Sequence, residues 1–154
     1  MKLAAAALFL VLIVLSVLYV LFMQRPKQYN QEITVGNTAV HIAIADDVSE
    51  QINGLSGVGK LCRDCGMLFV FPQAKLQRFW MHGMQFPLDF VFIRDSRIVE
   101  LAENVPVKDG SGNVSQIHSL EEADMVLELP AGFVAKNNIS IGSPLSGLGE
   151  GRVR

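Results

Sequence analysis

The sequence predicts a mainly β domain of the α+β class, a small antiparallel sheet or barrel with one or two short helices, preceded by one transmembrane helix. Half of the 154 residues are hydrophobic and only 18% are charged, yet residues 3–23 hold a long uncharged run. The rest of the chain has many short apolar runs separated by Gly, Pro, Asn and Asp, a pattern typical of antiparallel sheets. Its roughly 127 residues suffice for one domain core and not for two.

Residues 1–27 are predicted to be a membrane anchor. As a helix, the 21 residues from 3 to 23 would span about 31 Å, the thickness of a bilayer's hydrocarbon core. Tyr19, and Arg25 and Lys27 beyond it, fit an interfacial boundary. The alternative is a cleaved secretory signal, but the run is longer than a signal core and lacks a small-residue cleavage site at its end. We expect the membrane to be a partner through residues 3–23, with the domain on the extracytoplasmic side.

A polar linker, 28–31, leads into the domain, where the first strands and a helix are expected. Short alternating runs predict strands at 32–35 and 39–44, joined by a tight turn at Gly36 and Asn37. Asp47 and, three residues later, Glu50 form a capping-box pattern that predicts a short helix over 47–55. Three glycines between 54 and 59 then indicate a loop.

The remaining strands follow in short apolar runs. Residues 66–71 are apolar on both faces, as in a central strand, and Pro72 is expected to end that strand. Further strands are expected at 78–81, 88–93, 97–103, 125–129 and 139–145, with a second short helix over 131–138. Residues 146–154 have few large apolar groups and are predicted to be a flexible tail, so the domain spans 32–145.

Charge and motifs exclude several classes of function. After residue 27, ten Lys and Arg stand against fifteen Asp and Glu, a net charge of −5 without a basic patch, so no nucleic-acid partner is predicted. The Gly54–Val58 segment has valine where a nucleophile elbow needs glycine, and its glycine spacing does not match a phosphate loop. The acidic residues between 121 and 124 are interpreted as a solvated face. We therefore predict no catalytic residue and no cofactor.

A family resemblance emerges from an ordered set of motifs. Seven of the nine aromatic residues after residue 27 lie between Phe69 and Phe92. The motifs are Gly54-Leu55, Gly66-Met-Leu-Phe-Val-Phe71, Phe79-Trp-Met-His-Gly-Met84 leading into Pro87-Leu88-Asp89, Val126-Leu127-Glu128, and Ala131-Gly132. In this order they resemble Domain of Unknown Function 192 (DUF192) over roughly residues 32–145. The resemblance implies a small β-rich domain, often exported or membrane-attached, without an established activity.

Trp80, His82 and Asp89 are the candidate ligand-binding residues. Asp89 lies on an otherwise apolar strand face, where a carboxylate must be hydrogen-bonded, paired or at the solvent end. It could accept backbone N–H groups in the neighbouring turn, or it could face a pocket walled by Trp80 and bind a polar ligand such as a sugar. The family usually has a Lys-Asn-Thr triplet where this chain has His82-Gly-Met84, so the resemblance carries over to Trp80 and Asp89 more directly than to His82.

Cys62 and Cys65 are the other chemical signal. They could form a disulfide, supply half of a metal site, or exchange thiols. They lie in a loop that leads into a strand, whereas a redox motif should open a helix, so a loop-bracing disulfide is predicted. The alternative is a copper or zinc site; its candidate ligands are Cys62, Cys65, Met81, His82 and Met84.

The sequence is therefore compatible with two functions. The first is a membrane-anchored binding module for a small polar or envelope ligand. The second is an envelope protein that handles a metal ion or thiols. Nothing in the sequence requires catalysis.

Overall fold

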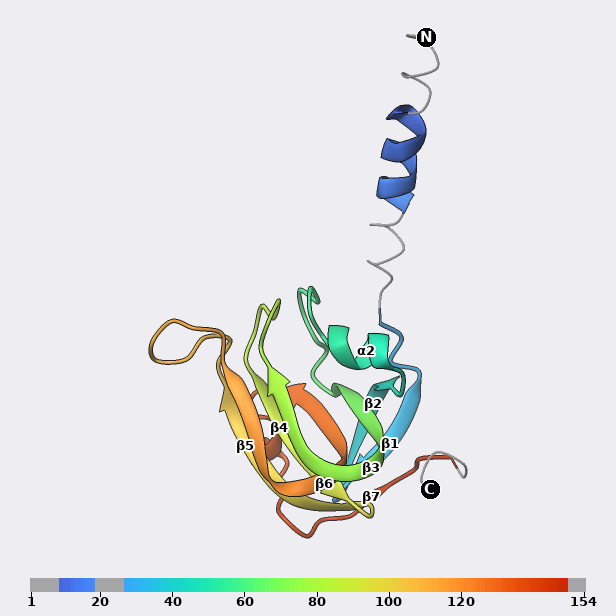
Figure 1. Cartoon of the computed structure of the whole chain (residues 1–154). Helices are drawn as coiled ribbons and strands as arrows, with labels where there is room; N and C mark the ends of the chain where they lie inside the picture. Colours follow the sequence, from blue (N-terminus) through green and yellow to red (C-terminus); the bar gives the residue numbers. More distant parts are fainter. Residues whose placement is uncertain (1–8, 19–26, 150–154) are drawn as a thin grey trace.

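The computed structural model describes residues 9–18 and 27–149 (Figure 1). Residues 9–18 form a helix. Within the described residues, no helix combines the length and the apolar character that crossing a membrane requires. The predicted anchor, residues 3–23, lies partly outside the described residues.

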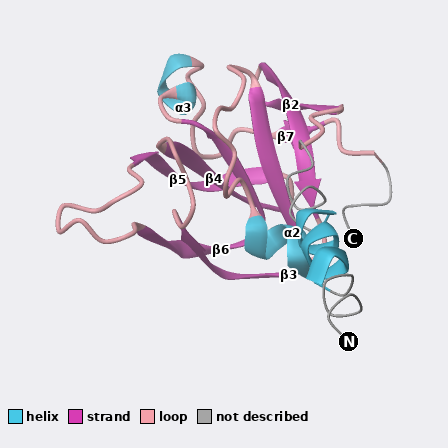
Figure 2. Ribbon diagram, turned by 90° about the horizontal axis from the view of Figure 1, so that it is seen from above, coloured by secondary structure: helices cyan, strands magenta, loops and turns pink. Residues whose placement is uncertain are grey.

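The domain is built around one curled sheet of seven strands in the order β5-β4-β6-β3-β2-β1-β7 (Figure 1). Its elements are β1 (Gln31–Val35), β2 (Thr38–Ala45), α2 (Val48–Asn53), β3 (Cys65–Trp80), β4 (Leu88–Arg94), β5 (Arg97–Val105), β6 (Gln116–Pro130), α3 (Phe133–Lys136) and β7 (Leu145–Ser146). The two short helices lie apart from each other at the periphery of the sheet (Figure 2). The prediction of a mainly β domain with one or two short helices is confirmed.

The prediction of an antiparallel sheet or barrel needs two corrections. β2 and β3 pair in parallel, because the chain crosses between them through α2 and a long loop, so the sheet is mixed. The sheet is also not closed, since its edges are β5 and β7. An isolated bridge between Arg97 and Pro144 and a hydrogen bond from the Ile98 N–H to the Ser143 carbonyl (3.0 Å) bring these edges close without forming a ladder.

β3 is longer than predicted, because Pro72 does not end it. The ladder between β3 and β6 is interrupted between Val70 and Lys75, and again between Leu76 and Arg78. Pro72 falls within the first interruption, where its missing N–H removes no ladder hydrogen bond. The strand therefore bends and continues to Trp80, and β6 pairs with this extension from Gln116 onward instead of beginning near residue 125.

The predicted strand over residues 139–145 is wrong. Gly142 has a positive φ of 87° and Pro144 has no N–H, so this segment turns, and only Leu145 and Ser146 pair with β1. Within the predicted tail, residues 146–154, Leu148 packs against the core. Residues 150–154 of that tail lie outside the described residues.

Apolar side chains form two clusters on opposite faces of the sheet. β4 shows this division: Val91 and Ile93 belong to one cluster, while Phe90 and Phe92 belong to the other. All six residues from Leu88 to Ile93 are buried, as expected for a strand between β5 and β6 that is covered on both faces. The cluster that contains Phe90 and Phe92 also forms the floor beneath the cavity described next.

Candidate functional site

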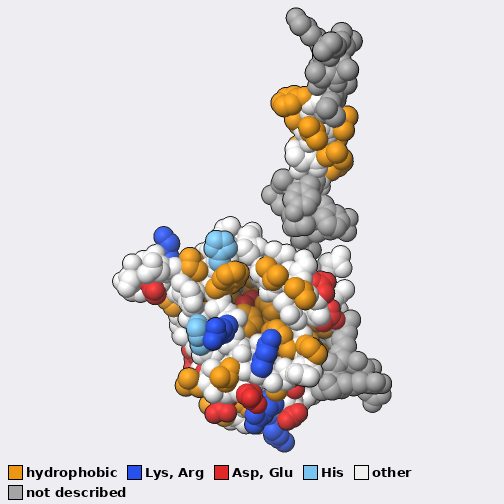
Figure 3. Space-filling view, in the orientation of Figure 1, with side chains coloured by type: hydrophobic (Ala, Val, Ile, Leu, Met, Phe, Trp, Pro, Cys, Tyr) orange, Lys and Arg blue, Asp and Glu red, His pale blue; other side chains and the backbone are white. Residues whose placement is uncertain are grey.

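A cavity of about 680 Å³ lies between α2, the loop after α2, β3 and the neighbouring part of β6. The face in Figure 3 is hollowed here, with hydrophobic side chains around the hollow and Lys, Arg and His side chains beside it. The residues that line it include Val48, Ile52, Phe69, Phe71, Lys75, Leu76, Arg78, Phe79, Trp80, His82, Met84, His118 and Glu128. Its volume is in the range of sites that hold small organic ligands.

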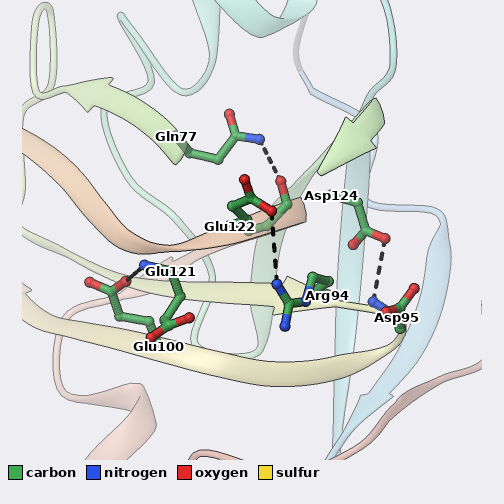
Figure 4. A network of polar contacts seen from close by, with 8 residues as sticks. Gln77, Arg94, Asp95, Glu100, Glu121, Glu122 and Asp124 are labelled. Carbon is green, nitrogen blue, oxygen red and sulfur yellow. Dashed lines mark hydrogen bonds and ion pairs between the residues drawn. The ribbon is translucent and has the colours of Figure 1, made fainter. Parts of the chain in front are cut away.

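The bend in β3 that shapes the cavity is held by buried polar contacts. At the second ladder interruption, the Gln77 N–H donates to the Ser119 Oγ (2.8 Å). The Gln77 side-chain amide donates to the Ala123 carbonyl (2.6 Å), as Figure 4 shows. Close by, the acidic run interpreted as a solvated face is largely exposed, and Glu122 makes a long 4.0 Å ion pair with Arg94 (Figure 4). Such an exposed pair contributes little to stability. The bend therefore depends on Gln77 rather than on the surface charges.

Two loops meet at one side of the cavity. The Gly57 N–H donates to the Gly83 carbonyl (3.0 Å), which joins the loop after α2 to the loop after β3. Gly83 has a φ of +73°, and a Cβ there would overlap the Ser56 hydroxyl. Glycine is thus required at residue 83 both for the backbone conformation and for the close approach of the two loops.

Glu128 provides a buried carboxyl group at the cavity. It lies on β6 opposite Met67 of β3 and Phe90 of β4, and only 5% of the residue is exposed. Its Oε2 atom is buried without a hydrogen-bond partner. Burial raises the pKa of Glu128 to about 8, although the positive charge of Lys27 acts in the opposite direction. The carboxyl is therefore mainly protonated at neutral pH and can donate as well as accept a hydrogen bond.

Tyr29 shares this environment from the linker side. Its side chain packs against the apolar cluster that contains Met67 and Phe90, and its hydroxyl is also buried without a hydrogen-bond partner. Desolvation raises the pKa of Tyr29, and the charge of Glu128 raises it further. Two polar groups in this apolar region thus lack the hydrogen bonds that buried polar atoms normally make.

Aromatic side chains form the wall above the carboxyl group. The ring of Phe79 packs edge-on against Phe69 (centroids 4.9 Å apart) and lies 6.5 Å from Phe71. Such edge-to-face geometry is favourable and fixes the orientation of the rings. The ammonium group of Lys75 lies 5.5 Å from the centroid of the Phe71 ring. The cavity thus combines flat apolar walls with positive charge near its opening.

Trp80 lies at the mouth of the cavity rather than in the core. It is 57% exposed, and its ring centroid lies 5.9 Å from that of His82, which is also exposed. Three further lining side chains are exposed and apolar: Val48, Ile52 and Leu76. The structure therefore brings two of the three predicted ligand-binding residues, Trp80 and His82, to one opening with an apolar rim.

Asp89, the third predicted residue, is not among the residues that line this cavity. It is fully buried, and its carboxylate accepts three backbone N–H groups: Asn104 (2.7 Å) and Gly132 (3.1 Å) on Oδ1, and Val134 (2.9 Å) on Oδ2. These contacts brace the start of α3 and a residue of β5 with positive φ. Of the two interpretations from the sequence, this geometry favours a backbone brace, although its donors are not in the turn at 86–87.

The five residues of the predicted metal set are distributed over three places. Cys62 and Cys65 are joined in a disulfide at the start of β3. Met81 is buried in the core, whereas His82 and Met84 line the cavity. The cysteines thus lie outside the cavity lining to which the histidine belongs.

Glu128 is the residue that the sequence analysis missed as a candidate. It appeared only within the motif Val126-Leu127-Glu128, yet it lies between two leucines in a strand that is apolar on both faces. A carboxyl group in such a strand, like that of Asp89, cannot be both buried and ionised without partners, so its position in the sequence indicates an unusual environment.

The fold and the cavity define a small β-rich domain with a ligand-sized cavity. Residues 31–147 match the family model DUF192, described as "Uncharacterized ACR", and the chain belongs to this family. The resemblance seen in the sequence is thereby confirmed. No curated protein matches the chain.

Two solved structures are similar to this chain. One is a protein of unknown function from Novosphingobium aromaticivorans, with 26% identity and a TM-score of 0.67, and the match covers 75% of this chain and 83% of that chain. The other, from Sinorhizobium meliloti, is provisionally described as a transcription regulator. It has 31% identity and a TM-score of 0.66, and the match covers 75% of this chain and 90% of that chain.

Proposed function

We propose that the domain is a binding module that takes a small polar ligand with a flat, apolar body into the cavity beside Trp80. The observation that supports this most directly is the unpartnered Glu128 carboxyl at an aromatic-walled cavity. A buried polar atom without a partner costs free energy, and a ligand group that hydrogen-bonds to it would recover that cost. Lys75 and Arg78 beside the opening would favour an anionic group at the outer end of the ligand.

Anilinonaphthalene sulfonate, a flat aromatic anion, is a suitable first probe. Trp80 is the only tryptophan in the chain, so energy transfer from its indole reports that the probe has bound to the domain. We expect the domain, residues 28–154, to bind one probe molecule saturably. Sugars or planar carboxylates that enter the cavity should displace the probe, and a panel of both identifies them.

Two exposed leucines give a matched pair of variants. Leu76 (58% exposed) lines the cavity, whereas Leu120 (85% exposed) is not among its lining residues. Leu76→Asp should weaken probe binding about tenfold, because it removes apolar contact and places a negative charge beside an anion. Leu120→Asp should leave the affinity unchanged. Equal effects of the two substitutions, or probe binding without energy transfer from Trp80, would contradict the proposed site.

We further propose that residues 3–23 anchor this module in a membrane, with the domain on the extracytoplasmic side. The support is the long uncharged run in the sequence and the exposed apolar side chains of the helix over residues 9–18. The one hydroxyl of that helix, on Ser16, donates to the Ile13 carbonyl (2.7 Å), so it would enter lipid already hydrogen-bonded.

A further inference from the structure

The loop over residues 62–65, termed here the cysteine loop, is fixed against β2. The Cys65 N–H donates to the Cys62 carbonyl (3.3 Å), and the His41 N–H donates to the Asp64 carbonyl (2.8 Å). In the parallel register, His41 lies opposite Cys65. Residues in register on neighbouring strands project to the same face of a sheet. His41 and the cysteine loop are therefore brought together by strand pairing, although they lie more than twenty residues apart in sequence.

Three potential metal ligands meet at this place, and His41 lies beside one of them. The Cys62 and Cys65 sulfurs and a carboxylate oxygen of Asp64 all lie within 4.8 Å of one another. The His41 Nε2 atom lies 3.8 Å from the Asp64 Oδ2 atom. In a tetrahedral zinc site, metal–ligand distances of about 2.0–2.3 Å place the ligand atoms about 3–4 Å apart. To complete such a set, the His41 side chain must rotate toward the sulfurs, and both His41 and Asp64 are about half exposed, so the core does not hold these side chains in place.

The other imidazole nitrogen of His41 also has a suitable neighbour. Glu32 lies opposite His41 in the β1–β2 ladder, and its Oε2 atom is 3.9 Å from the His41 Nδ1 atom. Metal-binding histidines usually direct the nitrogen that does not bind the metal toward a carboxylate or a carbonyl, which fixes the tautomer and the ring orientation. His41 thus has the Glu32 carboxylate beside its Nδ1 atom and Asp64 of the cysteine loop beside its Nε2 atom.

We infer that the cysteine loop, when its cysteines are reduced, is a zinc site completed by a histidine from the neighbouring strand. The four ligands are Cys62, Asp64, Cys65 and His41. Two thiolates with one imidazole and one carboxylate are a donor set that Zn²⁺ favours. The site differs from the set predicted from the sequence, because His41 and Asp64 take the place of Met81, His82 and Met84. It is also separate from the cavity, since none of its four ligands lines that cavity.

In the structure the cysteines are in the disulfide form, so zinc binding requires a prior reduction. A water-soluble phosphine supplies it: the disulfide takes up two electrons and two protons to give two thiols, while the phosphine and a water molecule give the phosphine oxide. Zinc then displaces the two thiol protons as it binds.

The test uses the full-length chain in detergent micelles, reduced with the phosphine under nitrogen and dialysed. Zinc is titrated against a chromophoric chelator, and Co²⁺ is used as a spectroscopic substitute. We expect one zinc ion per reduced chain and none per oxidised chain, and a thiolate-to-cobalt charge-transfer band with the visible bands of tetrahedral Co²⁺. Retention of no zinc by the reduced chain would overturn the inference.

Substitutions test the ligand set. His41→Ala should lower zinc affinity at least tenfold, and Glu32→Gln about tenfold, the lower end of the usual effect of an outer-shell partner. Asp46→Asn, an exposed carboxylate just beyond β2, is the control and should have no effect. The oxidised forms of His41→Ala, Glu32→Gln and Asp46→Asn, which keep both cysteines, should melt like the oxidised wild type, which excludes misfolding. Unchanged zinc affinity in His41→Ala or in Cys62→Ser would also overturn the inference.

Discussion

Asp89 and Glu128 are both buried acidic residues of the domain, and their surroundings differ completely. The Asp89 carboxylate accepts three backbone N–H groups, so its charge is used to hold α3 and β5 in place. The Oε2 atom of Glu128 accepts no hydrogen bond and lies among apolar groups. At the scale of single residues, one acid is therefore committed to the backbone, while the other keeps a proton that a ligand can use.

The raised pKa of Glu128 makes stability depend on pH. The unfolded carboxyl ionises near its ordinary value of 4.5, whereas the folded one ionises at about 8. Between these values the folded chain binds a proton that the unfolded chain has lost, so the free energy of unfolding falls as pH rises, by up to about 1.4 kcal/mol per pH unit. The contribution is fully present below pH 4.5 and is lost as pH rises through about 8. Glu128→Gln has no proton to lose and should not show this fall.

Urea unfolding of the wild type and Glu128→Gln at several pH values across this window measures the difference. The free energy of unfolding of the variant, relative to the wild type, should rise steadily with pH. Glu121→Gln, which replaces an exposed glutamate on the same strand, should follow the wild type at every pH. Parallel curves for the wild type and Glu128→Gln would show that the buried carboxyl is ionised throughout.

At the scale of elements, the cavity depends on two loops that approach each other through glycine. Gly57 and Gly83 both have positive φ, but a Cβ at Gly57 would meet nothing within 4 Å, whereas one at Gly83 would overlap Ser56. A comparison of substitutions at these two glycines therefore distinguishes the cost of backbone strain from the cost of steric overlap. Gly57→Ala should cost about 1 kcal/mol through its backbone conformation alone.

Gly83→Ala should cost about 1–3 kcal/mol more than Gly57→Ala, because the Ser56 hydroxyl must rotate away and the Ser56 Cβ, 3.2 Å from the added methyl group, must also shift with its loop. The free energies of unfolding of both variants in urea provide the comparison. Since the moved loops border the cavity, Gly83→Ala should also weaken binding of anilinonaphthalene sulfonate, and Gly57→Ala should weaken it less. Equal losses of stability in the two variants would mean that the loop contact is not tight.

Elements set by local sequence were predictable, whereas those set by distant contacts were not. Asp47 caps α2 as expected, its Oδ1 accepting the Glu50 N–H (2.8 Å), because capping involves residues three apart. The continuation of β3 past Pro72 depends on partners from β6 that lie 36 to 48 residues away, and no local pattern indicates it. The same holds for the parallel pairing of β2 with β3, which alone brings His41 to the cysteine loop.

The candidate site was predictable in part for the same reason. Trp80 and His82 lie close in sequence and reach the same opening, as their shared motif indicated. Asp89 was an equally good candidate by pattern, but the donors that it binds come from residues 104, 132 and 134. Only the folded chain distinguishes a carboxylate with three distant N–H donors from one without a partner.

At the scale of the whole molecule, the compartment in which the domain lies would determine the state of the cysteine loop. An oxidising compartment would keep Cys62 and Cys65 as the disulfide, and a reducing one would favour the thiol form that we infer to bind zinc. The cavity does not depend on this state, because neither cysteine lines it. Ligand binding and metal binding are thus separable properties, and only metal binding depends on whether the compartment is oxidising or reducing.

The orientation can be measured with a fusion of alkaline phosphatase to the C-terminus of the full-length chain. This enzyme needs disulfides and is active only in an oxidising compartment, so an extracytoplasmic domain predicts an active fusion. A β-galactosidase fusion at the same site, which is active only in the cytoplasm, should be inactive.

In the same cells, maleimide treatment of the denatured chain should label neither cysteine before reduction and both after it. A well-expressed but inactive phosphatase fusion, with an active β-galactosidase fusion and two labelled cysteines, would place the domain in the cytoplasm. The zinc form of the cysteine loop would then be the one present in the cell.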